Sequence, residues 1–297
     1  MWAFSSGGSQ GVEFRDPFMR PFAPCFEGSA ASLHRYLLRR AGRITRYNRW
    51  RQGNNTLDYQ KPQIAEIYDL VNPWSQDSEF YVSLAGRRPC SVLDLGCGTG
   101  TLCCALAERG HWVTGVDPAA AMLDVAKRKP HAEQVEWVES SAQSYGSHRR
   151  FDLITMTGHV FQVLLTDADA LAVLDNVRGH LKKRGRVAFE TRNPSVDWAV
   201  EWAGRRRGVH TPLGGQLIET LDILGRDGEL ISFRTSYCLP AVTLTTNSTL
   251  RFPSRQHVEG LIARSGLVLR DVLGDWDGVP YDAAGSREVI FIAEIAG

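Results

Sequence analysis

Several features that this sequence lacks exclude whole classes of protein. No apolar run approaches the ~20 residues that a membrane-spanning helix needs, so we expect no membrane span. The six cysteines form no C-x-x-C pair and no spacing typical of a disulfide framework, so we expect reduced thiols, a cytoplasmic protein and no metal site. The formal net charge is only +1, so the chain lacks the basic excess of proteins that grip phosphate backbones.

The positive charge is concentrated at one end of the sequence. Residues 1–57 contain nine arginines and three acidic residues, a charge of +6, so the other 240 residues together carry −5. That acidic remainder argues against a nucleic-acid partner. We expect 1–57 to be a poorly ordered basic extension with one amphipathic helix, at 32–50. A targeting peptide and a contact with an anionic surface are the alternatives.

One glycine-rich stretch organises the rest of the chain. Residues 91–100 read SVLDLGCGTG, in which a short apolar run typical of a buried parallel strand is followed by a glycine at every second position. Residues 101–107 then predict a helix, closed by Gly110. A strand, a glycine turn and a helix in this order bring a ligand close to main-chain N–H groups, as in nucleotide sites of α/β proteins.

This stretch resembles motif I of the class I S-adenosylmethionine-dependent methyltransferases, D-x-G-x-G-x-G. Pyrophosphate-binding oxidoreductases use G-x-G-x-x-G instead. An acid before the turn repels a pyrophosphate but suits a ligand that carries an ammonium and a sulfonium. The resemblance implies that the turn binds the cofactor S-adenosyl-L-methionine through Asp94, Gly96, Cys97, Gly98, Thr99 and Gly100.

Three further stretches extend the predicted cofactor site. Asp117 ends a strand-like stretch 21 positions beyond Gly96, where an acid can accept hydrogen bonds from both ribose hydroxyls, and Pro118 opens the next helix. This acid matches motif II of the family. The resemblance also implies that the loop after 135–138 touches adenine, although a serine stands where the family often has an acid. The predicted contacts of these later stretches are Ser141, Ala142, Gln143 and Thr157.

His159 is the predicted catalytic residue. It follows the strand-like stretch 151–156, at the sheet edge where ligands dock in these folds, and no Asn/Asp-Pro-Pro-aromatic turn of base-methylating enzymes is present there. An imidazole at this edge can remove a proton from a hydroxyl, carboxyl, thiol or amine near neutral pH. The alternatives are a histidine that only binds a lid backbone group, and catalysis that depends on alignment alone.

The acceptor side is predicted from aromatic and charged residues. Within the resemblance, the helices at 64–71 and 78–84 form a lid whose aromatic rings could favour a sulfonium, and Arg192 could clamp a carboxylate. Packing of the rings and pairing of the charges are the structural alternatives. The predicted substrate-binding residues are Tyr59, Tyr68, Trp74, Gln162, Glu190, Arg192 and Trp276.

The remaining patterns predict the domain organisation. Three strand-like stretches with an Asp-Gly turn between 214 and 250 predict an inserted antiparallel cap, and the core resumes with a helix at 254–265. We therefore expect an α/β fold: a Rossmann-like seven-stranded sheet with helices on both faces, a β-rich substrate cap and an N-terminal helical lid. The expected parts are the extension 1–57, the core with its lid 58–194, the cap 195–250 and the rest of the core 251–297.

The predicted function is transfer of a methyl group from S-adenosyl-L-methionine to an oxygen, nitrogen or carbon of a small-molecule acceptor. Two other classes are open: an NAD-type Rossmann oxidoreductase and a non-catalytic S-adenosylmethionine-binding protein. Asp94 and the glycine spacing argue against the first. The sequence predicts neither the identity of the acceptor nor the oligomeric state.

Overall fold

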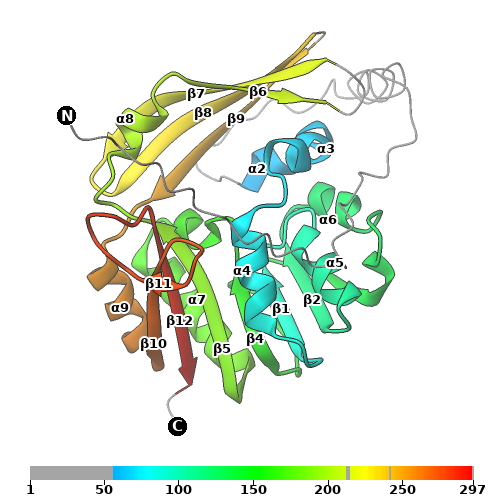
Figure 1. Cartoon of the computed structure of the whole chain (residues 1–297), viewed down its shortest axis with the longest axis vertical. Helices are drawn as coiled ribbons and strands as arrows, with labels where there is room; N and C mark the ends of the chain where they lie inside the picture. The colour runs from blue at the N-terminus through cyan, green and yellow to red at the C-terminus, as the bar shows by residue number, and fades with distance from the viewer. Residues whose placement is uncertain (1–55, 212–214, 241, 296–297) are drawn as a thin grey trace, which may run out of the picture.

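The computed structural model describes residues 56–211, 215–240 and 242–295, so nearly all of the predicted extension lies outside it. Its larger sheet has the strand order β11-β10-β12-β5-β4-β1-β2-β3 (Figure 1). Strands β1 to β5 run parallel, and β12 pairs antiparallel with both β5 and β10. The strands are β1 (Ser91–Leu95), β2 (Trp112–Asp117), β3 (Val135–Glu139), β4 (Phe151–Met156), β5 (Leu181–Arg192), β10 (Leu267–Gly274), β11 (Val279–Pro280) and β12 (Glu288–Ile295).

The predicted Rossmann-like sheet is confirmed, with one addition. Seven strands account for the predicted sheet, and the eighth is β11, a two-residue strand. It pairs with the end of β10, Gly274 opposite Val279. A two-residue strand has no periodicity of its own, so only the pairing reveals it.

Helices cover both faces of this sheet, as the alternating apolar residues of its strands require. One face packs against α4 (Gln76–Ala85) and α5 (Thr101–Glu108) through residues such as Val92 and Leu153, and the other packs against α7 (Asp167–His180) and α9 (Arg255–Arg264) through Leu93 and Ile154. The connections contain α6 (Ala120–Ala126), η1 (Ala132–Gln134) and η2 (Val160–Val163). In the described part of the chain, no helix combines the length and apolar character needed to cross a membrane.

A second, four-stranded antiparallel sheet forms a cap with the order β6-β7-β8-β9. Its strands are β6 (Arg205–His210), β7 (Gln216–Asp227), β8 (Leu230–Leu239) and β9 (Val242–Arg251), and α8 (Trp198–Trp202) packs on its base. The expected Asp227-Gly228 turn joins β7 to β8, with Gly228 at φ +55°. The sequence analysis did not assign β6, because its residues RRRGVH show no apolar alternation.

Of the two helices predicted to form the lid, only α3 (Pro62–Val71) lies between the cap and the larger sheet, together with the short α2 (Thr56–Tyr59) (Figure 1). The other, α4, packs on a face of the larger sheet through Phe80 and Tyr81, so it belongs to the core and not to the lid. Ile64 and Ile67 of α3 pack against Leu217 and Tyr237 of the cap. Another side of α3 packs against α6 through Ala65. The lid is therefore held between the cap and the part of the sheet that carries the glycine turn.

Candidate functional site

The glycine turn after β1 is held in place by the end of β2. Gly96 and Cys97 both donate their backbone N–H to the carbonyl oxygen of Val116, at 2.7 and 3.0 Å. Gly96 has a φ of +77°, and a Cβ atom there would lie 2.4 Å from the Val160 side chain. Because no larger residue fits, the glycine allows the turn and the loop after β4 to approach each other closely.

Asp117 lies directly beside this turn. Its carboxylate accepts the backbone N–H of Gly98 at 2.9 Å and that of Ala119 at 2.8 Å. Each carboxylate oxygen keeps a further lone pair, so two hydroxyl donors can still bind. Burial raises the pKa of Asp117, and the two N–H bonds oppose that rise. The arrangement fits the predicted contact with the two hydroxyls of a ribose.

Two side chains with apolar atoms, Met122 and Tyr68, lie beside Gly98 of the turn. A Cβ atom added at Gly98 would meet Met122 Cε at 3.7 Å and Tyr68 Cε1 at 3.9 Å. The structure thus places Tyr68, predicted as a lid residue, next to the glycine turn and Asp117. Apolar atoms and an aromatic ring near a carboxylate suit a nucleoside with a cationic sulfur.

Asp94 points into the protein interior. It is only 1% exposed, and it accepts hydrogen bonds from Thr155 Oγ1 at 2.8 Å and Cys103 Sγ at 3.4 Å. Burial raises the pKa of Asp94 to about 6, and these two donors oppose the rise. Since protein groups from β4 and α5 already contact the carboxylate, the contact with the donor's cation that we expected of Asp94 remains a prediction.

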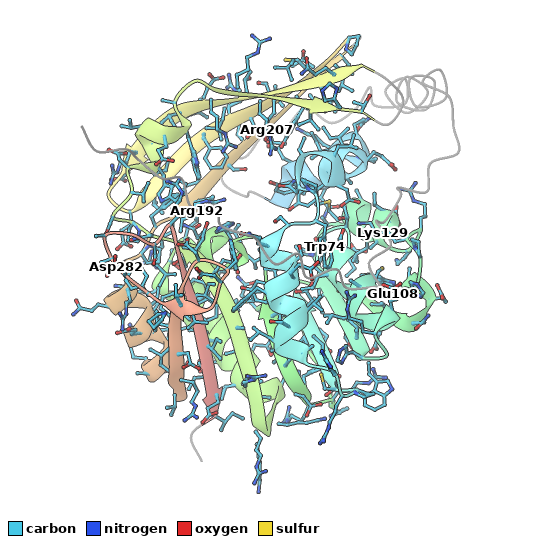
Figure 2. The ribbon with its side chains drawn as sticks, in the orientation of Figure 1. Trp74, Glu108, Lys129, Arg192, Arg207 and Asp282 are labelled. Atoms are coloured by element: carbon cyan, nitrogen blue, oxygen red, sulfur yellow. The ribbon has the colours of Figure 1, made fainter. Side chains whose placement is uncertain are left out.

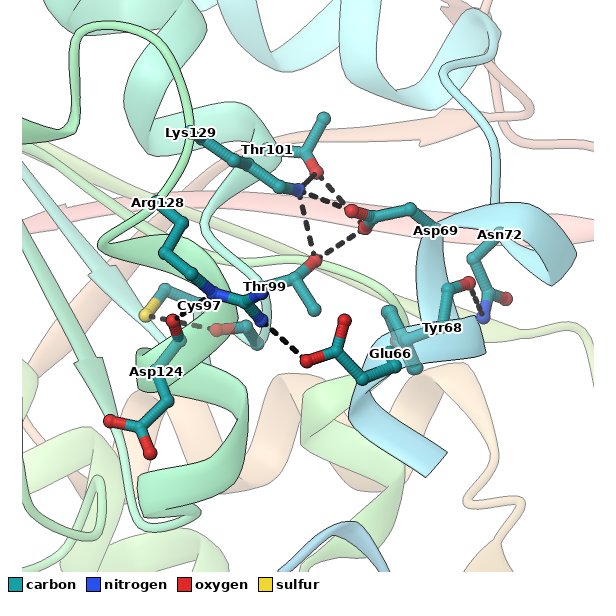
Figure 3. A network of polar contacts seen from close by, with 11 residues as sticks. Glu66, Tyr68, Asp69, Asn72, Cys97, Thr99, Thr101, Asp124, Arg128 and Lys129 are labelled. Carbon is teal, nitrogen blue, oxygen red and sulfur yellow. Dashed lines mark hydrogen bonds and ion pairs between the residues drawn. The ribbon is translucent and has the colours of Figure 1, made fainter. Parts of the chain in front are cut away.

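A network of ion pairs fastens the lid helix α3 to the turn (Figure 3). Asp69 accepts from Thr99 Oγ1 at 2.5 Å and pairs with Lys129 Nζ at 2.7 Å. Glu66 pairs with Arg128 at 2.6 Å. The sequence analysis missed these residues; the acids three positions apart in α3 were the available signal. The network closes the lid over Thr99, one of the predicted cofactor-binding residues.

The predicted adenine loop follows β3 and lies beside β2, since the Ser140 N–H donates to the carbonyl oxygen of Asp117 at 3.2 Å. Ser141 Oγ bonds Ser144 Oγ at 2.7 Å, and the Ala142 carbonyl accepts from Asn176 at 2.7 Å. The side chain of Gln143 is exposed. Two predicted cofactor contacts remain, Pro118 and Thr157. The carbonyl oxygen of Pro118 accepts from Gln60 Nε2 at 2.6 Å, and Thr157, which follows β4, is half-buried.

His159 lies where three strand ends meet. Its φ is +63°, and its backbone N–H donates to Glu190 Oε1 of β5 at 2.6 Å. Its Nε2 lies 3.0 Å from Glu288 Oε2, on the first residue of β12. The hydroxyl of Tyr81 donates to the other oxygen of Glu190. The sequence analysis missed Glu288 and Tyr81, because only the antiparallel placement of β12 brings Glu288 to this edge.

Burial determines how this cluster holds protons. Burial lowers the pKa of His159 to about 3, and the positive charge of nearby Arg192 contributes to this decrease. Burial raises the pKa of Glu288 to about 8, with Arg192 opposing the rise. Burial therefore favours the uncharged form of both side chains. The catalytic role of His159 stays a prediction, and its contact with Glu288 means that the two groups should titrate together.

Arg192 ends β5 beside this cluster and lies near the junction of the cap and the core (Figure 2). Its guanidinium stacks over Trp202 at 5.0 Å and Trp198 at 5.7 Å from the ring centroids. Its Nη1 donates to Gln162 Oε1 at 3.0 Å, and the Gln162 amide in turn donates to the Arg251 carbonyl at 2.7 Å. The structure thus brings Gln162, Glu190 and Arg192 together with His159.

The other predicted substrate residues have partners within the protein. Tyr59 and Tyr68 meet edge to face with their ring centroids 6.0 Å apart in the lid. Trp276 packs edge-on against Phe80, centroid to centroid 5.8 Å, on helix α4. Trp74 Nε1 donates to Glu79 Oε1 at 2.5 Å, next to the lid. These contacts show how the rings are held, and their contact with a substrate stays a prediction.

Comparisons with known proteins identify relatives of this chain. Residues 92–185 match a family described as a methyltransferase domain. The Cypemycin N-terminal methyltransferase of a Streptomyces species is 29% identical over 235 residues, which cover 77% of this chain and 94% of that protein. The ubiquinone biosynthesis O-methyltransferase of Coxiella burnetii is 35% identical over 161 residues, which cover 45% of this chain and 62% of that protein.

Solved structures share the fold. An S-adenosylmethionine-dependent methyltransferase from Clostridium acetobutylicum superposes with a TM-score of 0.66 at 17% identity, over 79% of this chain and 98% of that one. The sugar N-methyltransferase KedS8 from Streptoalloteichus gives 0.64 at 16% identity, over 86% and 97%. The family match, the relatives and the fold favour methyl transfer over the oxidoreductase and non-catalytic alternatives. The chain is therefore an S-adenosylmethionine-dependent methyltransferase, with S-adenosyl-L-methionine as its methyl donor.

Proposed function

We propose that this enzyme methylates an amine nitrogen, and that the pair His159–Glu288 takes up the proton that the amine must lose. The observation that carries the proposal is the 3.0 Å contact between His159 Nε2 and Glu288 Oε2 at the ligand-binding edge of the sheet. An ammonium has no free lone pair, so a proton acceptor is needed before nitrogen can attack. When bound, S-adenosylmethionine supplies an electrophilic methyl group on a sulfonium.

The geometry leaves one nitrogen of the imidazole available to an acceptor. Glu288 contacts Nε2, while Nδ1 has no hydrogen-bond partner among residues 56–211, 215–240 and 242–295. The backbone bond to Glu190 holds the residue itself. Once Glu288 has lost its proton, it can accept the Nε2–H of the imidazole, which leaves Nδ1 as the base. Most of the rate would still come from alignment of nitrogen with the methyl group.

A comparison supports the nitrogen acceptor. The relative named as an N-terminal methyltransferase covers most of this chain. The proposal includes a small-molecule or short-peptide acceptor rather than nucleic acid. It also includes a cytoplasmic location, supported by the free state of Cys90, Cys97, Cys103, Cys104 and Cys238.

Release of S-adenosylhomocysteine from three probes tests the acceptor atom. L-alaninamide offers a free amine, N-acetyl-L-alaninamide blocks the same amine, and catechol offers hydroxyl groups. We expect turnover with L-alaninamide that acetylation abolishes. Turnover of catechol without turnover of the free amine would overturn the choice of nitrogen.

A further inference from the structure

Arg192 carries a charge that no acidic side chain in the described part of the chain neutralises by direct contact. None of the carboxylate oxygens there lies within 4.0 Å of its guanidinium nitrogens. The nearest candidates along the sheet are engaged elsewhere. Glu190 accepts from Tyr81 and from the His159 backbone, and Glu288 contacts the His159 ring. A cation enclosed in a protein normally finds an anion or several hydrogen-bond acceptors.

The guanidinium is nevertheless held firmly. Trp198 and Trp202 stack on it, and the amide of Gln162, itself fully buried, accepts from Nη1. That bond uses one of the five N–H donors of an arginine. The residue keeps part of its surface exposed, and partial enclosure between cap and core lowers its pKa to about 10. The remaining donors form a preorganised fork of the kind that binds carboxylate or carbonyl oxygens.

We propose that Arg192 binds an oxygen of the acceptor, a carboxylate or carbonyl group carried within a few bonds of the methylated amine. The inference rests on the proposed amine methylation and names its substrate class: α-amino acids or peptides with a free N-terminus. The register of β5 and β12 is the reason that the oxygen and the amine should lie close together in the acceptor. Arg192 and Glu288 stand directly opposite each other on β5 and β12, and Glu288 contacts His159. The oxygen-binding group and the proton-accepting pair are therefore neighbours.

Three acceptors with the same amine and methyl group test the proposal. L-alanine carries a carboxylate, L-alaninamide a carbonyl only, and isopropylamine neither. The three amines differ in pKa, so kcat/KM is expressed per concentration of unprotonated amine. For the wild-type enzyme we expect it to be about tenfold to a hundredfold higher with at least one of the first two than with isopropylamine, the usual range for a charge-assisted hydrogen bond. Which of the two reacts better separates a free amino acid from a peptide.

Substitutions of Arg192 test whether this residue causes the preference. Arg192→Met keeps the packing on the tryptophans but removes the fork, so kcat/KM per concentration of unprotonated amine should be similar for all three. Arg192→Lys should recover only part of the preference. Arg287→Met is the matched control. Arg287 also stacks on Trp198, at 4.7 Å, but pairs with Glu201 at 2.5 Å, so the preference should persist. Thermal melting in the presence of S-adenosylmethionine verifies that each variant is folded.

The possible outcomes distinguish the role of Arg192 from the proposal that the enzyme methylates nitrogen. Equal values of this kcat/KM for all three amines in the wild type, or an unchanged preference in folded Arg192→Met, would overturn the role of Arg192. Salicylate and phenol provide a hydroxyl pair with and without a carboxylate. If only salicylate is methylated, and the Arg192→Met variant no longer methylates it, Arg192 does bind an acceptor oxygen but the proposal of a nitrogen acceptor is wrong. If no member of either series is methylated, the oxygen site is wrong as well.

Discussion

Glu288 Oε2 lies 3.0 Å from His159 Nε2, a contact between residues 129 positions apart in the chain. It joins the loop after β4 to the first residue of β12, next to Arg192. Charged or titratable groups on every neighbouring element act on the pair: Glu190 and Arg192 from β5, Asp77 from α4, and Asp275 and Arg287 before β12. The pair is therefore expected to titrate as a unit.

The rate of amine methylation should rise with pH through about 8, the value to which burial raises the pKa of Glu288. Below that pH the carboxyl keeps its proton and the pair accepts none; above it the pair acts as a base. Burial lowers the pKa of His159 to about 3, so no inflection is expected near ~6.5, the ordinary imidazole value. The pH dependence of kcat with L-alaninamide tests this. Glu288→Gln should lose the inflection, whereas titration of the amine itself would persist in that variant.

His159→Asn should lower turnover by ~10²–10⁴-fold, the usual cost of losing an acid–base group. Donor affinity should stay unchanged, because the predicted ribose and adenine contacts do not involve His159. Steady-state kinetics and calorimetric titration of S-adenosylmethionine measure the two quantities. A tenfold rise in KM with an unchanged kcat would instead make His159 a residue that orients the acceptor.

Asp117→Asn should weaken S-adenosylmethionine binding by ~1.5–3 kcal/mol, because the ribose hydroxyls lose a charged acceptor. The asparagine amide oxygen can still accept one of the two backbone N–H groups, from Gly98 or Ala119, so the fold should survive. Calorimetry gives the affinity and thermal melting checks the fold. An affinity within twofold of the wild type would remove the ribose assignment.

Lys129→Met should speed the release of the donor, because Lys129 pairs with Asp69 at 2.7 Å and so holds α3 over the glycine turn. Half-exposed pairs contribute up to about 1 kcal/mol, so we expect a dissociation rate about two- to fivefold faster, measured by stopped-flow fluorescence. Added salt should speed release in the wild type more than in the variant. Arg149→Met, which breaks the exposed pair Arg149–Glu136, is the control and should change nothing.

Gly96→Ala should lower the free energy of unfolding by about 1–3 kcal/mol, because a Cβ at φ +77° would lie 2.4 Å from Val160. Adding Val160→Ala removes the clash but not the strain of the positive φ, so it should restore part of the loss. Urea unfolding of the single and double variants measures the coupling. Additive effects would show that the two residues do not meet.

The parts of this protein that its sequence determines by itself are local. The apolar run at 92–95, the glycines that follow and Asp117 at the next strand end lie within about thirty residues. Their spacing therefore predicts the strand, the turn and the donor-binding acid before any tertiary contact is known. The resemblance that these motifs carry implies the Rossmann-like seven-stranded sheet.

Tertiary structure alone decided the acceptor side. Glu288 becomes a partner of His159 only because β12 enters antiparallel and begins at the edge where β4 and β5 end. The guanidinium of Arg192 lies beside tryptophans of α8 because the chain continues from β5 into the cap there. Asp94 faces Thr155 because β1 and β4 pair in a register that places the two residues opposite each other. Strand register and burial set these contacts across long separations. No spacing along the chain encodes them, and the same burial moves the pKa values from which the chemistry is inferred.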